Sequence, residues 1–175
     1  MKHLIKAALV IGALSLSACT NADRFDNADA VDLNAQNGLN DISQTGLGGA
    51  NDPASPQFFS QTIGDRVLFE VDTSSLTAAG RATLDGQARW LATNSDYLAV
   101  IEGHADEQGT REYNLALGAR RANAVREYLV SQGLAASRIR TVSYGKERPL
   151  EVCSAESCYA QNRRAVTIIS IGQNS

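Results

Sequence analysis

The sequence predicts an α/β fold over residues 57–175, a two-layer sandwich with helices on one face of a mixed β-sheet. Short apolar runs of strand length alternate along this part of the chain with longer segments of helical period. No internal repeat interrupts the alternation, and 13 Lys and Arg residues balance 13 Asp and Glu residues. A neutral segment of this length is sufficient for one hydrophobic core.

Four strands are expected, at residues 67–71, 98–101, 140–144 and 165–171. In the first, alternation places Val67, Phe69 and Val71 on one face. The second is a continuous apolar run, which indicates a buried strand.

Two helices are expected between these strands. Residues 77–93 carry Leu84, Ala88 and Leu91 at helical spacing. The second helix begins after Thr110, a good N-cap, and runs to about residue 132, where Gly133 ends it.

The charge and composition of the whole chain argue against nucleic acid as a partner. The net charge is -3 and the pI is about 5.4, so general basicity cannot attract a polyanion. Aromatic residues make up 6% of the chain, too few to favour a platform for stacking bases.

Residues 1–18 have the pattern of a signal peptide, with a positive start followed by an apolar run too short to span a bilayer. The run ends in Leu16-Ser17-Ala18-Cys19, which resembles a bacterial lipobox, although an ordinary signal peptide with a chance cysteine is the alternative. Lipidation at Cys19 would anchor the chain in a membrane. By resemblance to bacterial lipoproteins, Thr20 favours the outer membrane, with the rest of the chain in the oxidising periplasm.

Residues 19–56 are expected to be a lipidated start followed by a flexible acidic linker, because six Asp face one Arg and no period is present. A flexible chain of residues 20–56 has an end-to-end distance of roughly 35 Å, enough to carry a domain away from the lipid surface. A short helix on a partner, formed by Leu33, Leu39, Ile42 and Leu47, is the alternative.

The stretch 102–110 joins a strand to a helix, a common place for ligand sites in α/β domains. His104, Asp106 and Glu107 there could suggest a metal or an acid–base pair. The only other histidine is His3, so no histidine cluster with zinc spacing exists, and no nucleophile motif accompanies His104. We therefore expect no metal, no cofactor and no enzyme activity, with a buried structural role as the alternative for His104.

Arg120 and Arg121 are adjacent on the second expected helix. Because an α-helix turns by about 100° per residue, their side chains point in different directions. Arg121 falls within or at the rim of the apolar arc of Leu117, Gly118, Ala122, Val125 and Leu129. This position suits either a structural ion pair or a ligand carboxylate. Arg120 is expected to lie on the solvated surface.

Cys153 and Cys158 lie close together before the last strand. In an oxidising compartment this spacing predicts a local disulfide, with two reduced thiols as the alternative. The spacing differs from the C-x-x-C of redox enzymes.

Several motifs together resemble the OmpA-like domain family. They are GHADEQGT at 103–110, YNLALG at 113–118, RRA at 120–122, YGKERP at 144–149 and NRRAV at 162–166. The motifs follow one another in the order found in that family, and the resemblance covers about residues 67–171.

The resemblance implies noncovalent binding of peptidoglycan through the diaminopimelate of its stem peptide. Asp106 would then bind the ligand's ammonium, and Arg121 its carboxylate. These two residues can converge only if the 105–110 loop folds back along the helix. Asp72, His104 and Leu117 match further pocket positions of the family, whereas Val71 replaces an aromatic residue.

The resemblance also implies a role in the Tol system, which supports envelope integrity and outer-membrane invagination during cell division. A periplasmic β-propeller protein of that system would be the partner. Two rival hypotheses are a peptidoglycan hydrolase that uses His104 and Asp106, and an adaptor that chiefly binds proteins.

Overall fold

The computed structural model describes residues 49–172. The expected signal peptide, Cys19 and most of the acidic linker lie outside the described residues. Packed structure begins before residue 57, because the Trp90 indole donates to the Pro53 carbonyl at 2.7 Å. Ser55 caps the first helix and is 2% exposed, so the end of the predicted linker packs against the domain.

The described chain forms one four-stranded sheet with the strand order β1-β4-β2-β3. β4 pairs antiparallel with both β1 and β2, and β2 pairs parallel with β3. In chain order the elements are α1 (Pro56–Phe58), η2 (Phe59–Gly64), β1 (Arg66–Leu68), α2 (Ala78–Thr93), β2 (Tyr97–His104), α3 (Arg111–Ser131), η3 (Ala136–Arg138), β3 (Ile139–Gly145), α4 (Glu156–Asn162) and β4 (Arg164–Ile171). The predicted mixed sheet with helices is confirmed.

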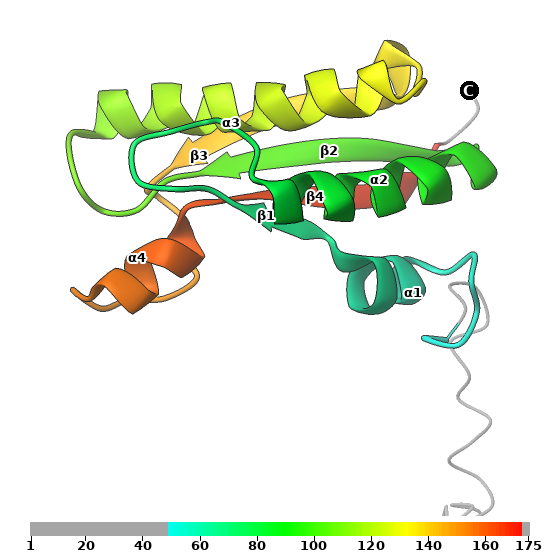
Figure 1. Ribbon diagram of the computed structural model, residues 1–175, viewed down its shortest axis with the longest axis horizontal. Coiled ribbons are helices and arrows are strands. Elements are labelled where there is room, and N and C mark those ends of the chain that lie inside the picture. The colour runs from blue at the N-terminus through cyan, green and yellow to red at the C-terminus, as the bar shows by residue number, and fades with distance from the viewer. Residues whose placement is uncertain (1–48, 173–175) are drawn as a thin grey trace, which may run out of the picture. The chain divides into compact units, whose positions relative to one another are not determined.

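The two long helices run along the sheet, and α4 lies beyond the ends of β2 and β3 (Figure 1). Thr77 caps α2 and Thr110 caps α3, each accepting a hydrogen bond from a backbone N–H three residues on. α3 ends before Gly133, which has φ +97. Both predicted helices are confirmed.

The hydrophobic core fills the space between these helices and one face of the sheet. It contains Leu84 and Leu91 of α2, Val125 and Leu129 of α3, and Ile101 of β2, all at most 2% exposed. The predicted apolar arc of α3 is therefore the face that packs on the sheet.

The backbone of α3 comes into direct contact with the sheet where two glycines meet. A Cβ added to Gly103 of β2 would overlap the carbonyl oxygen of Gly118 on α3. The backbone of α3 therefore contacts the end of β2 directly, which fixes the position of the following loop.

Two strand predictions were wrong in detail. β1 ends at Leu68, and Val71 is 56% exposed instead of sharing the buried face of Val67 and Phe69. The chain turns after Phe69, and Asp72 has φ 54, so the alternation stops there. Leu98 is 38% exposed because β2 is buried on one face only.

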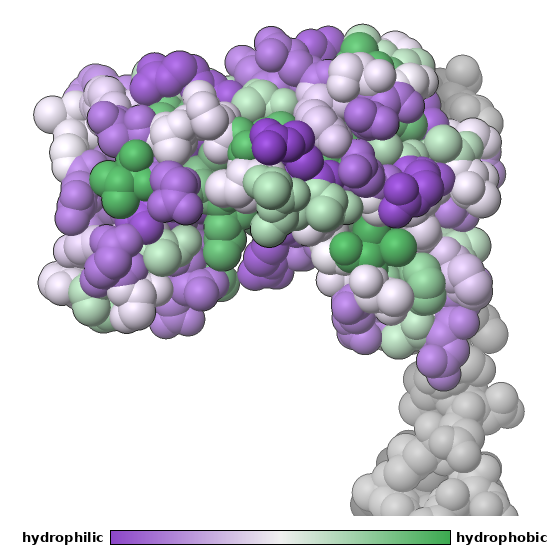
Figure 2. Space-filling view, viewed as in Figure 1, coloured by the Kyte–Doolittle hydropathy of each residue, from purple (hydrophilic) through white to green (hydrophobic). Residues whose placement is uncertain are grey.

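The face shown in Figure 2 carries apolar residues in separate small patches among polar ones. Within residues 49–172 this view shows no single broad apolar surface. No helix between residues 49 and 172 combines the length and apolar character needed to cross a membrane.

Candidate functional site

A cavity of about 280 Å³ opens where β2 passes into α3. Three segments line it: the turn after β1, the loop that follows β2, and the first turns of α3. The lining residues are Val71, Asp72, Asp106, Gln108, Gly109, Tyr113, Asn114 and Leu117. The loop after β2 folds back over the start of α3, where the Asn114 amide donates to the Gln108 carbonyl at 2.7 Å.

Asp106 lies on the wall of this cavity and is 8% exposed. One of its carboxylate oxygens accepts a hydrogen bond from the Gln108 backbone N–H at 3.2 Å. The other pairs with Arg163 at 3.2 Å. Burial of Arg163 disfavours its charged form and by itself would lower its pKa. Its hydrogen bonds with Glu156 and Asp106 have the opposite effect, and the pKa of Arg163 is raised overall. Asp106 is thus held in one orientation by both of its oxygens.

Asp72 supplies the second carboxylate of the cavity, from the turn after β1. Its backbone lies in the left-handed region, with φ 54, which aspartate tolerates better than most residues. The Tyr113 hydroxyl donates to this carboxylate, and the bond raises the pKa of Tyr113. The bond links the turn after β1 to α3 across the cavity.

Arg121 is wholly buried behind the cavity instead of lining it. Its guanidinium donates to the carbonyl oxygens of Thr73 at 2.8 Å, His104 at 2.8 Å and Glu70 at 3.2 Å. Burial lowers its pKa to about 10, while nearby Asp106 and Asp72 favour its charge. Arg121 therefore stays positive and connects the segments that carry both carboxylates. Arg120 is exposed, as the rotation count predicts.

His104 does not reach the cavity. It is 1% exposed, and its ring lies against Tyr144, with 5.6 Å between the ring centroids. Neither ring nitrogen has a hydrogen-bond partner among the described residues. Burial, followed by the charges of Arg164 and Arg148, lowers its pKa to about 4, so the ring is neutral near pH 7. The structure does not bring His104 together with Asp106 as an acid–base pair facing a substrate.

The structure places the other expected site residues as follows. Leu117 is 4% exposed and forms an apolar part of the cavity wall. Cys153 and Cys158 form a disulfide, the pairing that the spacing predicts. Within residues 49–172, no group of three or more His, Cys, Asp or Glu side chains is placed to hold a metal.

Sequence reasoning assigned no cavity role to Tyr113, Asn114, Gln108 and Gly109. The signal available was helical spacing, because Tyr113 and Asn114 lie four and three residues before Leu117. That spacing places them on one side of α3 but does not show which partner faces them.

The OmpA family model matches residues 68–163, which include β2, α3 and both carboxylates of the cavity. Among solved structures, the peptidoglycan-associated lipoprotein from Burkholderia pseudomallei is 38% identical with a TM-score of 0.62, covering 69% of this chain and 98% of that one. The C-terminal domain of Helicobacter pylori MotB, 19% identical with a TM-score of 0.58, shares the fold. It covers 63% of this chain and 87% of its own. The chain belongs to the OmpA family.

Within that family, curated relatives resemble this chain over most of its length. The peptidoglycan-associated lipoprotein of Rhizobium meliloti (strain 1021) is 58% identical over 131 residues, 74% of each chain. The protein of that name in Mesorhizobium japonicum is 48% identical over 161 residues, 92% of this chain and 89% of its own.

Proposed function

We propose that this chain is an outer-membrane lipoprotein that binds peptidoglycan noncovalently through diaminopimelate and so tethers the outer membrane to the cell wall. The observation that carries the proposal is the cavity in which Asp72 and Asp106 face a space of about 280 Å³. The names of its relatives in the OmpA family support it as well.

The charges of the cavity suit one end of a zwitterionic amino acid. Two carboxylates on the wall can accept hydrogen bonds from an ammonium group. The guanidinium of Arg121 is buried behind these carboxylates, and its positive charge would favour a ligand carboxylate bound in the cavity next to it. No observation favours the hydrolase hypothesis, because His104, its expected acid–base partner for Asp106, is buried and does not line the cavity.

The test of peptidoglycan binding is retention on purified sacculi, together with the affinity for a muropeptide that ends in diaminopimelate. Losing one partner of a desolvated charged pair costs about 2–5 kcal/mol, so Asp106→Asn should weaken binding by roughly 30-fold or more. Asp96→Asn, which removes the same charge from an exposed site outside the cavity, should bind like the wild type.

Three outcomes would count against the proposal. They are absent binding by the wild type, equal binding by both variants, and release of soluble fragments from the sacculi. A muropeptide with lysine in place of diaminopimelate lacks one carboxylate, so it should bind more weakly if that carboxylate is recognised.

The anchor and the partner form the remaining part of the proposal. Cys19 would carry the lipid, and the acidic residues between Thr20 and Pro53, where packing on the domain begins, would form the linker. The partner would be the periplasmic β-propeller protein of the Tol–Pal system. The Cys19→Ala variant, which lacks the lipid, should no longer sediment with membranes but should still bind sacculi. The β-propeller protein should compete with the muropeptide, and simultaneous binding of both would contradict a shared face.

A further inference from the structure

The loop that carries Asp106, Gln108 and Gly109 into the cavity is held by groups outside the sheet. The Lys146 ammonium donates to the carbonyl oxygens of Glu107 at 3.3 Å and Gly109 at 2.6 Å. The Glu107 carboxylate accepts from the hydroxyl of Tyr159 at 2.9 Å and from that of Ser154 at 3.4 Å. These groups come from a part of the chain about 40 to 50 residues away in sequence.

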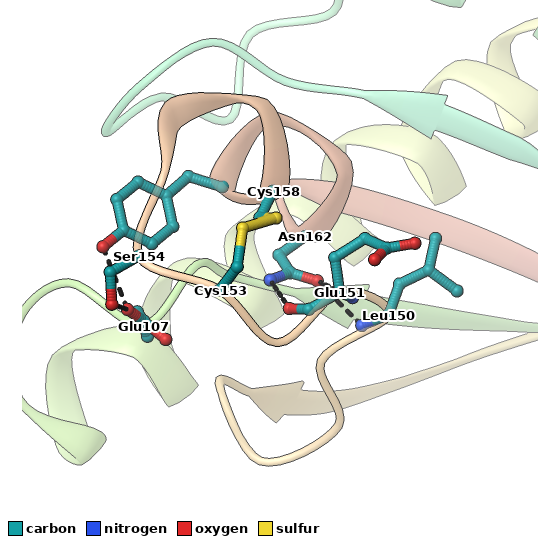
Figure 3. Close-up of a disulfide and its surroundings, with 8 residues drawn as sticks. Glu107, Leu150, Glu151, Cys153, Ser154, Cys158 and Asn162 are labelled. Carbon is teal, nitrogen blue, oxygen red and sulfur yellow. Dashed lines mark hydrogen bonds between the residues drawn. A yellow bond between two sulfur atoms is a disulfide. The ribbon is translucent and has the colours of Figure 1, made fainter.

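Ser154 lies within the residues that the Cys153–Cys158 bond closes, and Tyr159 directly follows them. Residues 153–159 are here called the disulfide loop. Figure 3 shows the disulfide between two sets of hydrogen bonds. On one side the Ser154 hydroxyl donates to the Glu107 carboxylate. On the other side Asn162 accepts from the backbone N–H groups of Leu150 at 2.7 Å and Glu151 at 3.1 Å.

The disulfide loop has little apolar packing of its own. Asn162 is the one buried residue of α4, and Val152 just before the loop is 83% exposed. A segment without buried apolar side chains opens easily unless another constraint holds it. The covalent link between Cys153 and Cys158 supplies that constraint.

A second connection runs from the disulfide loop to Asp106. Glu156 in the loop pairs with the Arg163 guanidinium, and Arg163 also pairs with Asp106. Arg163 is 4% exposed and donates to the Phe69 carbonyl at 3.2 Å. The loop therefore contacts Glu107 directly and reaches Asp106 through one arginine.

We propose that the disulfide loop is a positioning element of the ligand site, which keeps Asp106 and the residues after it in the orientation that binds peptidoglycan. The proposal rests on the function proposed above. Without the link, the hydroxyls of Ser154 and Tyr159 leave Glu107 more often. The loop at 106–109 then samples more conformations, and part of the binding free energy is spent on ordering it.

The test uses the full-length chain in detergent micelles and compares three variants. Cys153→Ser/Cys158→Ser removes the covalent link, and Tyr159→Phe removes one hydroxyl that donates to Glu107. Tyr97→Phe is the matched control, because that hydroxyl donates to the Ala54 carbonyl, away from the cavity. Two quantities are measured: hydrogen exchange of the Gln108 amide, which bonds to Asp106, and affinity for the diaminopimelate muropeptide.

We expect the double variant to exchange Gln108 faster and to bind about tenfold more weakly, a change of roughly 1.4 kcal/mol. Tyr159→Phe should move both quantities in the same direction by a smaller factor, and Tyr97→Phe should change neither. Exchange of core amides such as Ile101 should stay constant in Tyr159→Phe and Tyr97→Phe, whereas loss of the disulfide also lowers the global stability and raises core exchange in the double variant by a smaller factor than at Gln108. If the double variant fails to fold, the comparison of Tyr159→Phe with its control Tyr97→Phe tests the proposal.

Addition of dithiothreitol provides a second arm. The dithiol is oxidised to its cyclic disulfide, and its two electrons and two protons convert the Cys153–Cys158 bond to two thiols. The reductant should weaken binding by the wild type and leave the double variant unchanged.

Unchanged exchange and affinity in variants that fold would overturn the proposal. Weaker binding with unchanged Gln108 exchange would overturn it too, because the disulfide loop would then act by direct contact with the ligand. A wild type that ignores the muropeptide would refute the proposed function instead, and Gln108 exchange would still test the coupling in the free protein.

Discussion

Replacement of His104 by leucine should remove most of the loss of stability that we expect between pH 7.5 and pH 5. Burial of the ring holds its pKa at about 4 in the folded protein, against an ordinary value of 6.5. As pH falls below 6.5 the unfolded chain takes up a proton that the folded chain refuses, so stability falls until about pH 4. The whole difference is worth roughly 3 kcal/mol, and roughly 2 kcal/mol of it has developed by pH 5.

The measurement is urea unfolding of wild type and His104→Leu at pH 7.5 and at pH 5. Carboxylates that do not contact the ring are common to both proteins, so the difference between the two pH dependences reports on the imidazole together with Glu102, which lies 3.6 Å from it. Leucine also removes two ring nitrogens that have no partner in the described structure. A variant that loses as much stability as the wild type on acidification would refute this account of His104.

Three further substitutions test separate parts of the structure. Gly103→Ala should cost roughly 3 kcal/mol or more of unfolding free energy, because its Cβ would overlap a backbone oxygen of α3, whereas Gly49→Ala meets nothing and should be neutral. Arg121→Lys should lower the thermal midpoint, since an ammonium cannot reproduce three directed bonds to carbonyls of separate segments, while Arg120→Lys should not. Val71→Phe adds apolar surface to the cavity wall and should tighten muropeptide binding about fivefold, and equal affinity would show that this wall does not contact the ligand.

Local signals in the sequence were enough to predict the two long helices. Threonine caps, helical spacing and Gly133 fix the ends of α2 and α3 through interactions within a few residues. The short helix α4 has no such signal, because it lacks a side-chain cap and an apolar face. Its contacts come from a disulfide, from an ion pair between Glu156 and Arg163, and from the hydrogen bonds of Tyr159 and Asn162.

The candidate site was predictable in its carboxylates but not in its guanidinium. Asp72 and Asp106 lie in turns next to strand ends, where a motif is sufficient to place them on the cavity. The surroundings of Arg121 depend on carbonyl groups 17 to 51 residues away in sequence. Helical rotation shows that Arg121 faces inward but cannot show that backbone oxygens occupy much of its hydrogen-bonding capacity.

This burial changes how a loss of binding at Arg121 should be interpreted. Its three carbonyl partners belong to the turn that carries Asp72 and to the end of the strand that leads to Asp106. Removing the guanidinium takes one donor from each of those carbonyls and removes the link between the two walls of the cavity, so binding falls even if the ligand never contacts Arg121. Asp106→Asn keeps the size of the side chain and removes its charge, but it also replaces one of the two oxygens that accept from Gln108 and Arg163 with an NH2 donor. Recognition of the ligand's ammonium is therefore tested at Asp106 in a variant whose Gln108 amide exchanges as in the wild type, and the integrity of the cavity at Arg121.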